Sequence, residues 1–191
     1  MEHSTLVEQP ASARLTFEER EYAAQYLAAT RNHLAESLRG LTDAQWNFKP
    51  APDRWSIAEN LEHIAIVEER VQEIVGSMAQ APADSPDRDF KKVDAFVLVA
   101  IPMRHPKFKA PERVAPLTGM KGGEMLERFL RARVQTEELL RCSTNLRGRV
   151  VPHPAFGPWD GYEWILAAGG HCARHTGQIL EVKSDPNYPA A

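Results

Sequence analysis

The stretch His171-Cys172-Ala173-Arg174-His175 contains two histidines four residues apart, within the last segment of the chain whose apolar residues recur at helical spacing. If this segment is a helix, both rings lie on one face, about one turn from each other. Two imidazoles in that relation can bind the same divalent metal ion. Two ligands alone do not complete a metal site, so a further ligand has to come from another part of the chain. The same spacing also fits two histidines that only pack inside a helical bundle.

His63 is the candidate for a third ligand. It lies beside an apolar stripe that runs with helical spacing from Ile57 to Val75. If the fold places His63 opposite the pair, the three rings form a metal site with an open position for water or substrate. Glu59, one turn before His63, is a candidate base or fourth ligand, although it also completes a capping box with Ser56.

Four amphipathic segments predict four helices. The first covers about 17–39, the second begins after Ser56, the third runs from about 122 to 143, and the fourth begins near Asp160. Capping-box patterns mark the starts of the first, second and fourth segments. The chain between 145 and 158 is expected to be a loop, and no segment has a convincing strand pattern. An all-α four-helix bundle follows from this pattern.

The region from about 81 to 119 is interrupted by six prolines and separates the second and third helices. Only 93–101 is apolar enough to form a short helix or a buried segment. A connection of this length inside a compact domain is typical of a crossover, a lid or a wall of a site. We expect one domain over residues 16–185, preceded by a flexible tail at 1–15.

Three further polar residues are candidates for roles at the site. Gln178, like Glu59, is a catalytic candidate that would support the metal ligands, because it shares the helix face of His171 and His175 at positions i+7 and i+3. Arg104 lies in the proline-rich crossover, and His153 lies in the loop before the last helix. Either side chain could contact substrate, and either could equally be an ordinary exposed residue.

Composition excludes several classes of partner. The 191 residues carry a net charge of −3, which gives no electrostatic reason to expect nucleic-acid binding. No apolar run approaches the roughly 20 residues of a membrane span, and the polar start of the chain resembles no signal peptide. We therefore expect a cytoplasmic protein with no membrane partner. Cys142 and Cys172 form no metal or redox motif, and both are expected to be buried thiols.

Two segments resemble the DinB-like superfamily of metal-dependent enzymes. The segment 54–63, Arg-Trp-Ser-Ile-Ala-Glu-Asn-Leu-Glu-His, resembles the start of that family's second helix. Phe156-Gly157-Pro158, followed by Trp164 and by His171-x-x-x-His175-x-x-Gln178-Ile179, resembles its last helix. The resemblance extends over about 17–182. It implies an up-down-down-up bundle with a long crossover between helices two and three, and a divalent metal on His63, His171 and His175.

The resemblance also implies a range of functions. The superfamily includes thiol-dependent transferases and isomerases, and many members are regarded as metal-dependent hydrolases. We expect a metal-dependent enzyme whose zinc or nickel ion activates water or a low-molecular-weight thiol against a small molecule. The alternative is a non-catalytic metal-binding stress-response protein on the same scaffold. A homodimer is also expected, because four large aromatic residues lie near predicted helix ends and loops and could exceed the apolar surface that one small bundle covers: Trp46, Phe48, Trp159 and Tyr162.

Overall fold

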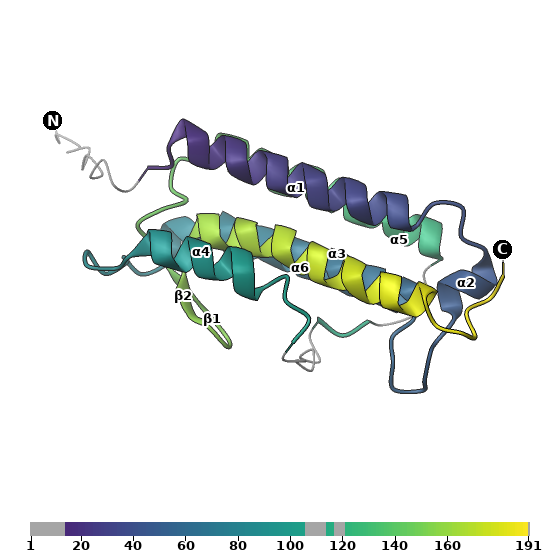
Figure 1. The fold of residues 1–191 in the computed structure, drawn as a ribbon. Helices are drawn as coiled ribbons and strands as arrows, with labels where there is room; N and C mark the ends of the chain where they lie inside the picture. The colour runs from purple at the N-terminus through teal and green to yellow at the C-terminus, as the bar shows by residue number, and fades with distance from the viewer. Residues whose placement is uncertain (1–13, 106–113, 117–120, 191) are drawn as a thin grey trace, which may run out of the picture.

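Four long helices form the body of the protein, as the computed structural model shows (Figure 1). The structure describes residues 14–105, 114–116 and 121–190. The bundle consists of α1 (Phe17–Ser37), α3 (Ile57–Gly76), α5 (Gly122–Cys142) and α6 (Gly161–Lys183). Shorter elements connect them, namely α2 (Asp43–Asn47), η2 (Met78–Gln80), α4 (Phe90–Ala100), β1 (Val151–His153) and β2 (Gly157–Trp159). The predicted four-helix bundle is confirmed.

Side-chain caps fix where three of the long helices begin. Thr16, Ser56 and Asp160 each accept a hydrogen bond from the backbone three residues later, and a glutamate at that position returns the bond. Each box satisfies backbone N–H groups that have no partner within the helix. The short helix α2, which the sequence did not predict, begins with the same arrangement of Thr42 and Gln45.

The helices follow the expected up-down-down-up path. Tyr162 Oη donates to Glu19 O near the start of α1 and α6, and Lys183 Nζ donates to Ser37 O at their other ends, so these helices are parallel. Arg20, at the start of α1, donates to Ser143 O just after α5, which makes α1 and α5 antiparallel. Figure 1 shows α3 running beside α6 in the opposite direction.

Apolar side chains from all four long helices fill the bundle, among them Leu27, Leu61, Phe129 and Ile165. One ion pair lies inside this core. Arg133 of α5 and Glu68 of α3 have side chains that are 0% and 1% exposed, and their groups meet through two hydrogen bonds of 2.8 Å.

The crossover between α3 and α5 contains more regular structure than the sequence indicated. The predicted short helix at 93–101 is present as α4, which packs against α6 (Figure 1). Arg147 holds this region in place, because its guanidinium donates to Asp94 at 2.6 Å and to Asp160 at 2.8 Å. The loop predicted at 145–158 instead contains β1 and β2, an antiparallel pair in which Pro152 lies opposite Pro158. Residues 1–13 of the predicted tail at 1–15, and crossover residues 106–113 and 117–120, lie outside the described residues.

Two expectations about surface residues were wrong. Cys142 is exposed, whereas Cys172 is buried as expected. Trp46, Trp159 and Tyr162 were expected to exceed what one bundle covers, but they are only 8%, 0% and 2% exposed. Phe48 is half-buried and packs edge-on against Tyr188. The fold therefore removes the surface argument for a dimer. Within the described ranges, none of the helices has the length and apolar character that crossing a membrane requires.

Candidate metal centre

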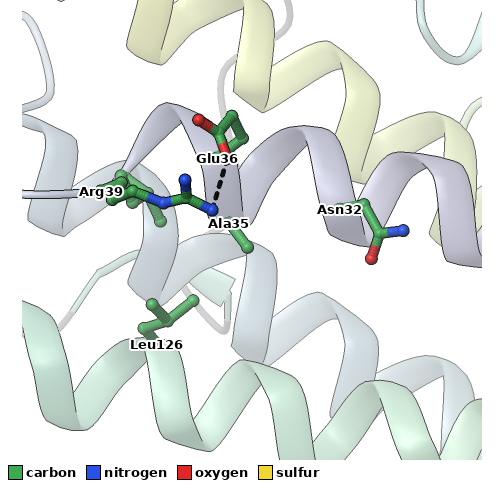
Figure 2. Close-up of a pocket in the computed structure, with 6 residues that line it drawn as sticks. Asn32, Ala35, Glu36, Arg39 and Leu126 are labelled. Atoms are coloured by element: carbon green, nitrogen blue, oxygen red, sulfur yellow. Dashed lines mark ion pairs between the residues drawn. The ribbon is translucent and has the colours of Figure 1, made fainter.

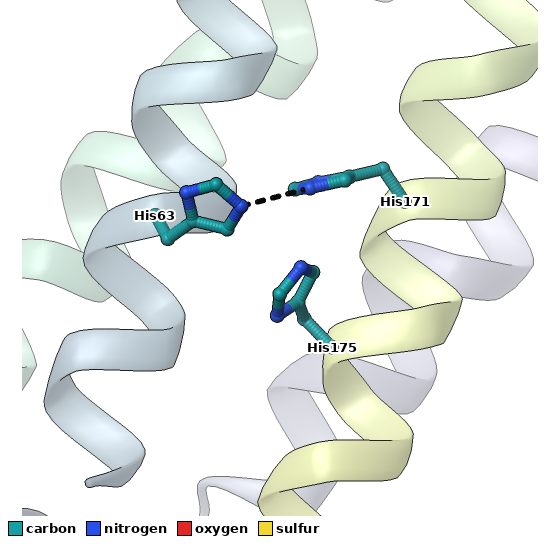
Figure 3. A group of neighbouring side chains, drawn as sticks. All are labelled: His63, His171 and His175. Carbon is teal, nitrogen blue, oxygen red and sulfur yellow. Dashed lines mark hydrogen bonds between the residues drawn. The ribbon is translucent and has the colours of Figure 1, made fainter. Parts of the chain in front are cut away.

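His63, His171 and His175 meet between α3 and α6, as the sequence pattern predicted (Figure 3). His63 projects from α3, and the other two rings project from successive turns of α6. Nε2 of His63 lies 3.1 Å from Nε2 of His171. One nitrogen of each ring can be chosen so that all three lie within 4.8 Å of one another. The antiparallel packing of α3 on α6 therefore brings together residues that are more than a hundred positions apart.

Two of the rings are oriented by hydrogen bonds on the side away from this meeting point. Nδ1 of His63 donates to the carbonyl oxygen of Val114 at 2.6 Å, and Nδ1 of His175 donates to Oδ1 of Asn60 at 3.1 Å. Asn60 is itself fixed, because its Nδ2 donates to the carbonyl oxygen of Ser56 at 2.8 Å. With the proton on Nδ1, the lone pair of Nε2 is available to a ligand.

The environment keeps the three rings neutral. Burial lowers the pKa of His63, and it lowers the pKa values of His171 and His175 well below their ordinary value. Neighbouring rings add to this effect, because a charge on one histidine opposes a charge on the next. Histidines binding a metal must be unprotonated, so these pKa shifts favour binding near neutral pH.

The nitrogen arrangement fits a divalent metal ion. Metal–nitrogen bonds of about 2.0–2.1 Å in a tetrahedral site place two ligand nitrogens roughly 3.3 Å apart. The 3.1 Å separation of the His63 and His171 Nε2 atoms is close to this value. If Nε2 of both rings carries a lone pair, the two atoms repel unless a cation lies between them. Three neutral nitrogen ligands suit zinc, nickel, iron or copper.

Trp55 and Gln178 lie next to the three histidines. The Trp55 ring is 4.9 Å from the His63 ring and 6.0 Å from the His175 ring, measured between centroids. The Gln178 side chain lies close enough to His175 to raise the pKa of that ring, which is consistent with its predicted position on the same face of α6. Glu59, by contrast, accepts from Ser56 N at 2.7 Å and from Lys49 Nζ at 2.9 Å. The structure therefore places Glu59 in its capping box, the role the sequence also allowed.

The crossover runs beside this site because α6 has glycines there. A side chain at Gly170 would begin 3.1 Å from Ile101, and one at Gly177 would begin 3.4 Å from Cδ of Arg104. Arg104 lies over α6 and binds Glu181 through two hydrogen bonds of 2.9 and 2.8 Å. The structure therefore places the candidate Arg104 along the edge of the histidine site.

In the described part of the chain, no contact joins His153 to the three histidines. Its ring stacks on Trp159 at 4.1 Å and on Phe156 at 4.9 Å, beside Trp164 at the start of α6. Its Nδ1 accepts a hydrogen bond of 3.1 Å from Ala155 N. Burial lowers its pKa to about 4. These contacts support a packing role in an aromatic cluster.

Replacing His153 with phenylalanine should reduce the acid sensitivity of the fold. The pKa of His153 is lowered to about 4 in the folded chain, from about 6.5 when unfolded. Acid therefore favours the unfolded state, and this loss of stability develops as pH falls from about 6.5 to 4. We expect a difference of roughly 1 kcal/mol across that range, because partial exposure screens the full effect. Urea unfolding of both proteins at pH 7 and pH 4.5 measures it, and equal losses in both would contradict the assignment.

The surface depression drawn in Figure 2 is separate from the histidines. It lies between α1 and the start of α5, has a volume of about 430 Å³, and contains the exposed ion pair of Glu36 with Arg39. Asn32, Ala35, Leu38 and Leu126 complete its lining. Its side chains include no pair with the geometry of a metal or acid–base site, so we place no chemistry there.

Sequence reasoning missed the two groups that orient the rings. Asn60 is 1% exposed on the buried face of α3, one turn before His63, and a polar residue beside the apolar stripe was a usable signal. The other group is the backbone carbonyl of Val114, for which side-chain identity carries no signal.

Comparisons with known proteins agree with this architecture. A family model described as the DinB superfamily matches residues 26–179. The uncharacterized protein YuaE of Bacillus subtilis (strain 168) is 30% identical over 150 residues, which are 76% of this chain and 88% of YuaE. The solved structure of YfiT from Bacillus subtilis aligns with a TM-score of 0.63 over 95% of this chain and 94% of its own, at 14% identity. YfiT is described as a probable metal-dependent hydrolase with an unusual four-helix bundle topology. At that identity, the likeness to YfiT establishes the fold alone.

Proposed function

This chain belongs to the DinB superfamily, and we propose that it is a metal-dependent enzyme that acts on a small molecule. The metal, zinc or nickel, is held by Nε2 of His63, His171 and His175. The observation that carries this proposal is the orientation of His63 and His175 by acceptors on their Nδ1 atoms. Histidine ligands in metalloproteins are oriented in this way by a carbonyl or carboxylate on the other nitrogen.

The ligand set fits a catalytic role better than a structural one. Structural zinc sites use four protein ligands, whereas catalytic sites use three and leave a position open. A divalent metal bound to three neutral histidines lowers the pKa of a bound water to about 7 and polarises a substrate carbonyl. Trp55 covers one side of the rings and restricts water there, while Gln178 supplies an amide beside His175.

We favour hydrolysis of an ester or amide bond as the reaction. The relative YfiT is described as a probable metal-dependent hydrolase. Transfer of a low-molecular-weight thiol to an electrophile is the second candidate. Glu59, the carboxylate one turn before His63 on α3, is occupied by its cap and by Lys49. A thiol ionises more readily than water and depends less on such a base.

Turnover assays on one protein preparation separate these possibilities. The protein is compared as purified, after chelator treatment, and after reloading with zinc or nickel. Each form is offered ester and amide substrates alone, and electrophiles together with an added thiol. We expect turnover to disappear with the metal and to return on reloading. Full metal occupancy without turnover of either class would instead favour the non-catalytic metal-binding protein.

Asn60 should affect metal affinity without touching the metal. Asn60→Leu keeps the side-chain size but removes the acceptor for Nδ1 of His175, so the ring is no longer oriented. We expect metal affinity to fall about 10- to 100-fold, as for other residues that orient ligands. Asn60→Asp keeps an acceptor oxygen and should stay much closer to the native affinity. Competition with a chromogenic chelator measures both variants, and native affinity in Asn60→Leu would contradict this role.

A further inference from the structure

Three arginines converge beside the proposed metal centre. Arg54 comes from the turn before α3, Arg104 from the crossover, and Arg174 from α6 between the two metal-binding histidines. Arg104 binds Glu181 through Nε and Nη2, and Nη2 of Arg54 lies 3.5 Å from Oε2 of the same carboxylate. Arg174 also lies within the electrostatic reach of Arg104 and Glu181. Two guanidinium groups from separate elements therefore contact one carboxylate, and a third, from α6, lies within reach of its charge.

This arginine cluster, defined as Arg54, Arg104 and Arg174, adjoins the rings of the triad. Arg174 directly precedes His175, and its charge contributes to lowering the pKa values of both His171 and His175. Arg104 contributes in the same way at His175. Trp55, which follows Arg54, packs against the rings of His63 and His175. A small molecule lying against Trp55 would therefore contact the cluster and the histidines together.

Arg104 has hydrogen-bonding capacity that its described surroundings do not use. Its Nη1 is buried and has no hydrogen-bond partner in the described part of the chain. A guanidinium nitrogen removed from water without an acceptor is unfavourable, and a carboxylate oxygen supplies the strongest kind of acceptor for it. The packing of Cδ on Gly177 fixes the side chain along α6. The group is therefore positioned before any ligand arrives.

We propose that the arginine cluster binds the carboxylate of an anionic substrate and holds its reactive carbon at the three histidines. This inference rests on the proposed function for the metal. The planar guanidinium matches a carboxylate through paired N–H groups, and Glu181 already occupies the cluster in this way. His175 and Glu181 are separated by about 9 Å along the helix axis. The substrate is thus a carboxylic acid whose electrophilic carbon lies several bonds from its carboxylate.

Binding of succinate, compared with uncharged succinamide, tests the inference without an activity assay. Isothermal titration is performed on the protein as purified, on Arg104→Gln and Arg174→Gln, and on Arg141→Gln as a control. Arg141 is an exposed arginine of α5 that pairs with Glu138, distant from the cluster. We expect at least a tenfold loss of succinate affinity in the first two variants and no change in the control. Succinamide should bind weakly to every protein.

Glu181→Gln should increase the affinity for succinate, a result that general damage to the fold would not produce. It removes the internal carboxylate that competes for the same nitrogens, so succinate affinity should rise severalfold. Equal affinity in all arginine variants, or weaker binding in Glu181→Gln, would overturn the inference. Metal content is measured on each sample. Bound metal with no arginine-dependent succinate binding refutes only this inference, whereas histidines that bind no metal refute the proposed function.

Discussion

His63→Ala should lose most of its metal while the bundle stays folded. His63 is the proposed ligand from α3, and without it only two rings from α6 remain. Two histidines hold a divalent ion far less tightly than three. We therefore expect the metal content to fall from about one ion per chain to less than about a tenth of an ion per chain. Apolar contacts along four helices stabilise the fold without the ion, unlike in a zinc finger. Elemental analysis after dialysis measures the metal, and circular dichroism measures the helix content.

His171→Ala and His175→Ala should behave in the same way, and Cys172→Ala is the matched control. Cys172 lies between the two proposed ligands in sequence, but its Sγ is 3.6 Å from the carbonyl oxygen of Thr30 on α1, away from His63. Burial raises the pKa of its thiol to about 11, so it is not available as a thiolate ligand. Loss of metal in Cys172→Ala, or full occupancy in His63→Ala, would contradict the three-histidine assignment.

Glu68→Gln should destabilise the protein by about 3–5 kcal/mol, because it leaves the buried guanidinium of Arg133 without a counter-charge. Arg133 also donates from Nη1 to Leu27 O at 2.9 Å and to Thr30 Oγ1 at 3.1 Å. It therefore joins α1, α3 and α5 and cannot turn to solvent. Urea unfolding in the presence of a chelator isolates this effect from any stabilisation by bound metal.

Glu69→Gln is the control for this prediction. Glu69 is the next residue of α3 and pairs with Arg128 of α5 at 2.6 Å, but the two side chains are 39% and 29% exposed. Partly exposed pairs contribute about 1 kcal/mol or less. A similar loss in both variants would show that burial does not set the strength of these pairs. Replacing Glu68 and Arg133 together with methionine should recover much of the stability lost in Glu68→Gln.

The helices and the three histidines could be predicted because their signals are local. A capping box spans four residues, and the pair on α6 is separated by one turn, so each can be recognised without the fold. The position of His63 beside an apolar stripe made it a candidate for the third ligand, but spacing alone does not join residues on different helices. The resemblance to a known family was the signal that implied a shared site for all three. The glycines before His171 also indicated that another helix packs closely against α6. A side chain at Gly169 would begin 2.7 Å from the Tyr26 ring, which explains the close approach of α1.

The errors concern contacts between distant parts of the chain. Trp46 was expected to be exposed because it lies near a helix end, but it packs against Gly122 at the start of α5. Arg147 falls in the segment predicted to be a loop, but it is 3% exposed and binds acidic groups from three elements. Such residues are buried by segments far away in sequence. The residues next to them in the sequence therefore do not indicate that they are buried.

Anomalous diffraction from crystals of the purified protein tests the central claim most directly. Data collected on both sides of the zinc and nickel absorption edges locate the ion and identify it. We predict one strong peak between α3 and α6, about 2.0–2.1 Å from a nitrogen of each of His63, His171 and His175. Histidine rings that stay in direct contact with no anomalous peak between them, in crystals grown with either metal, would contradict it.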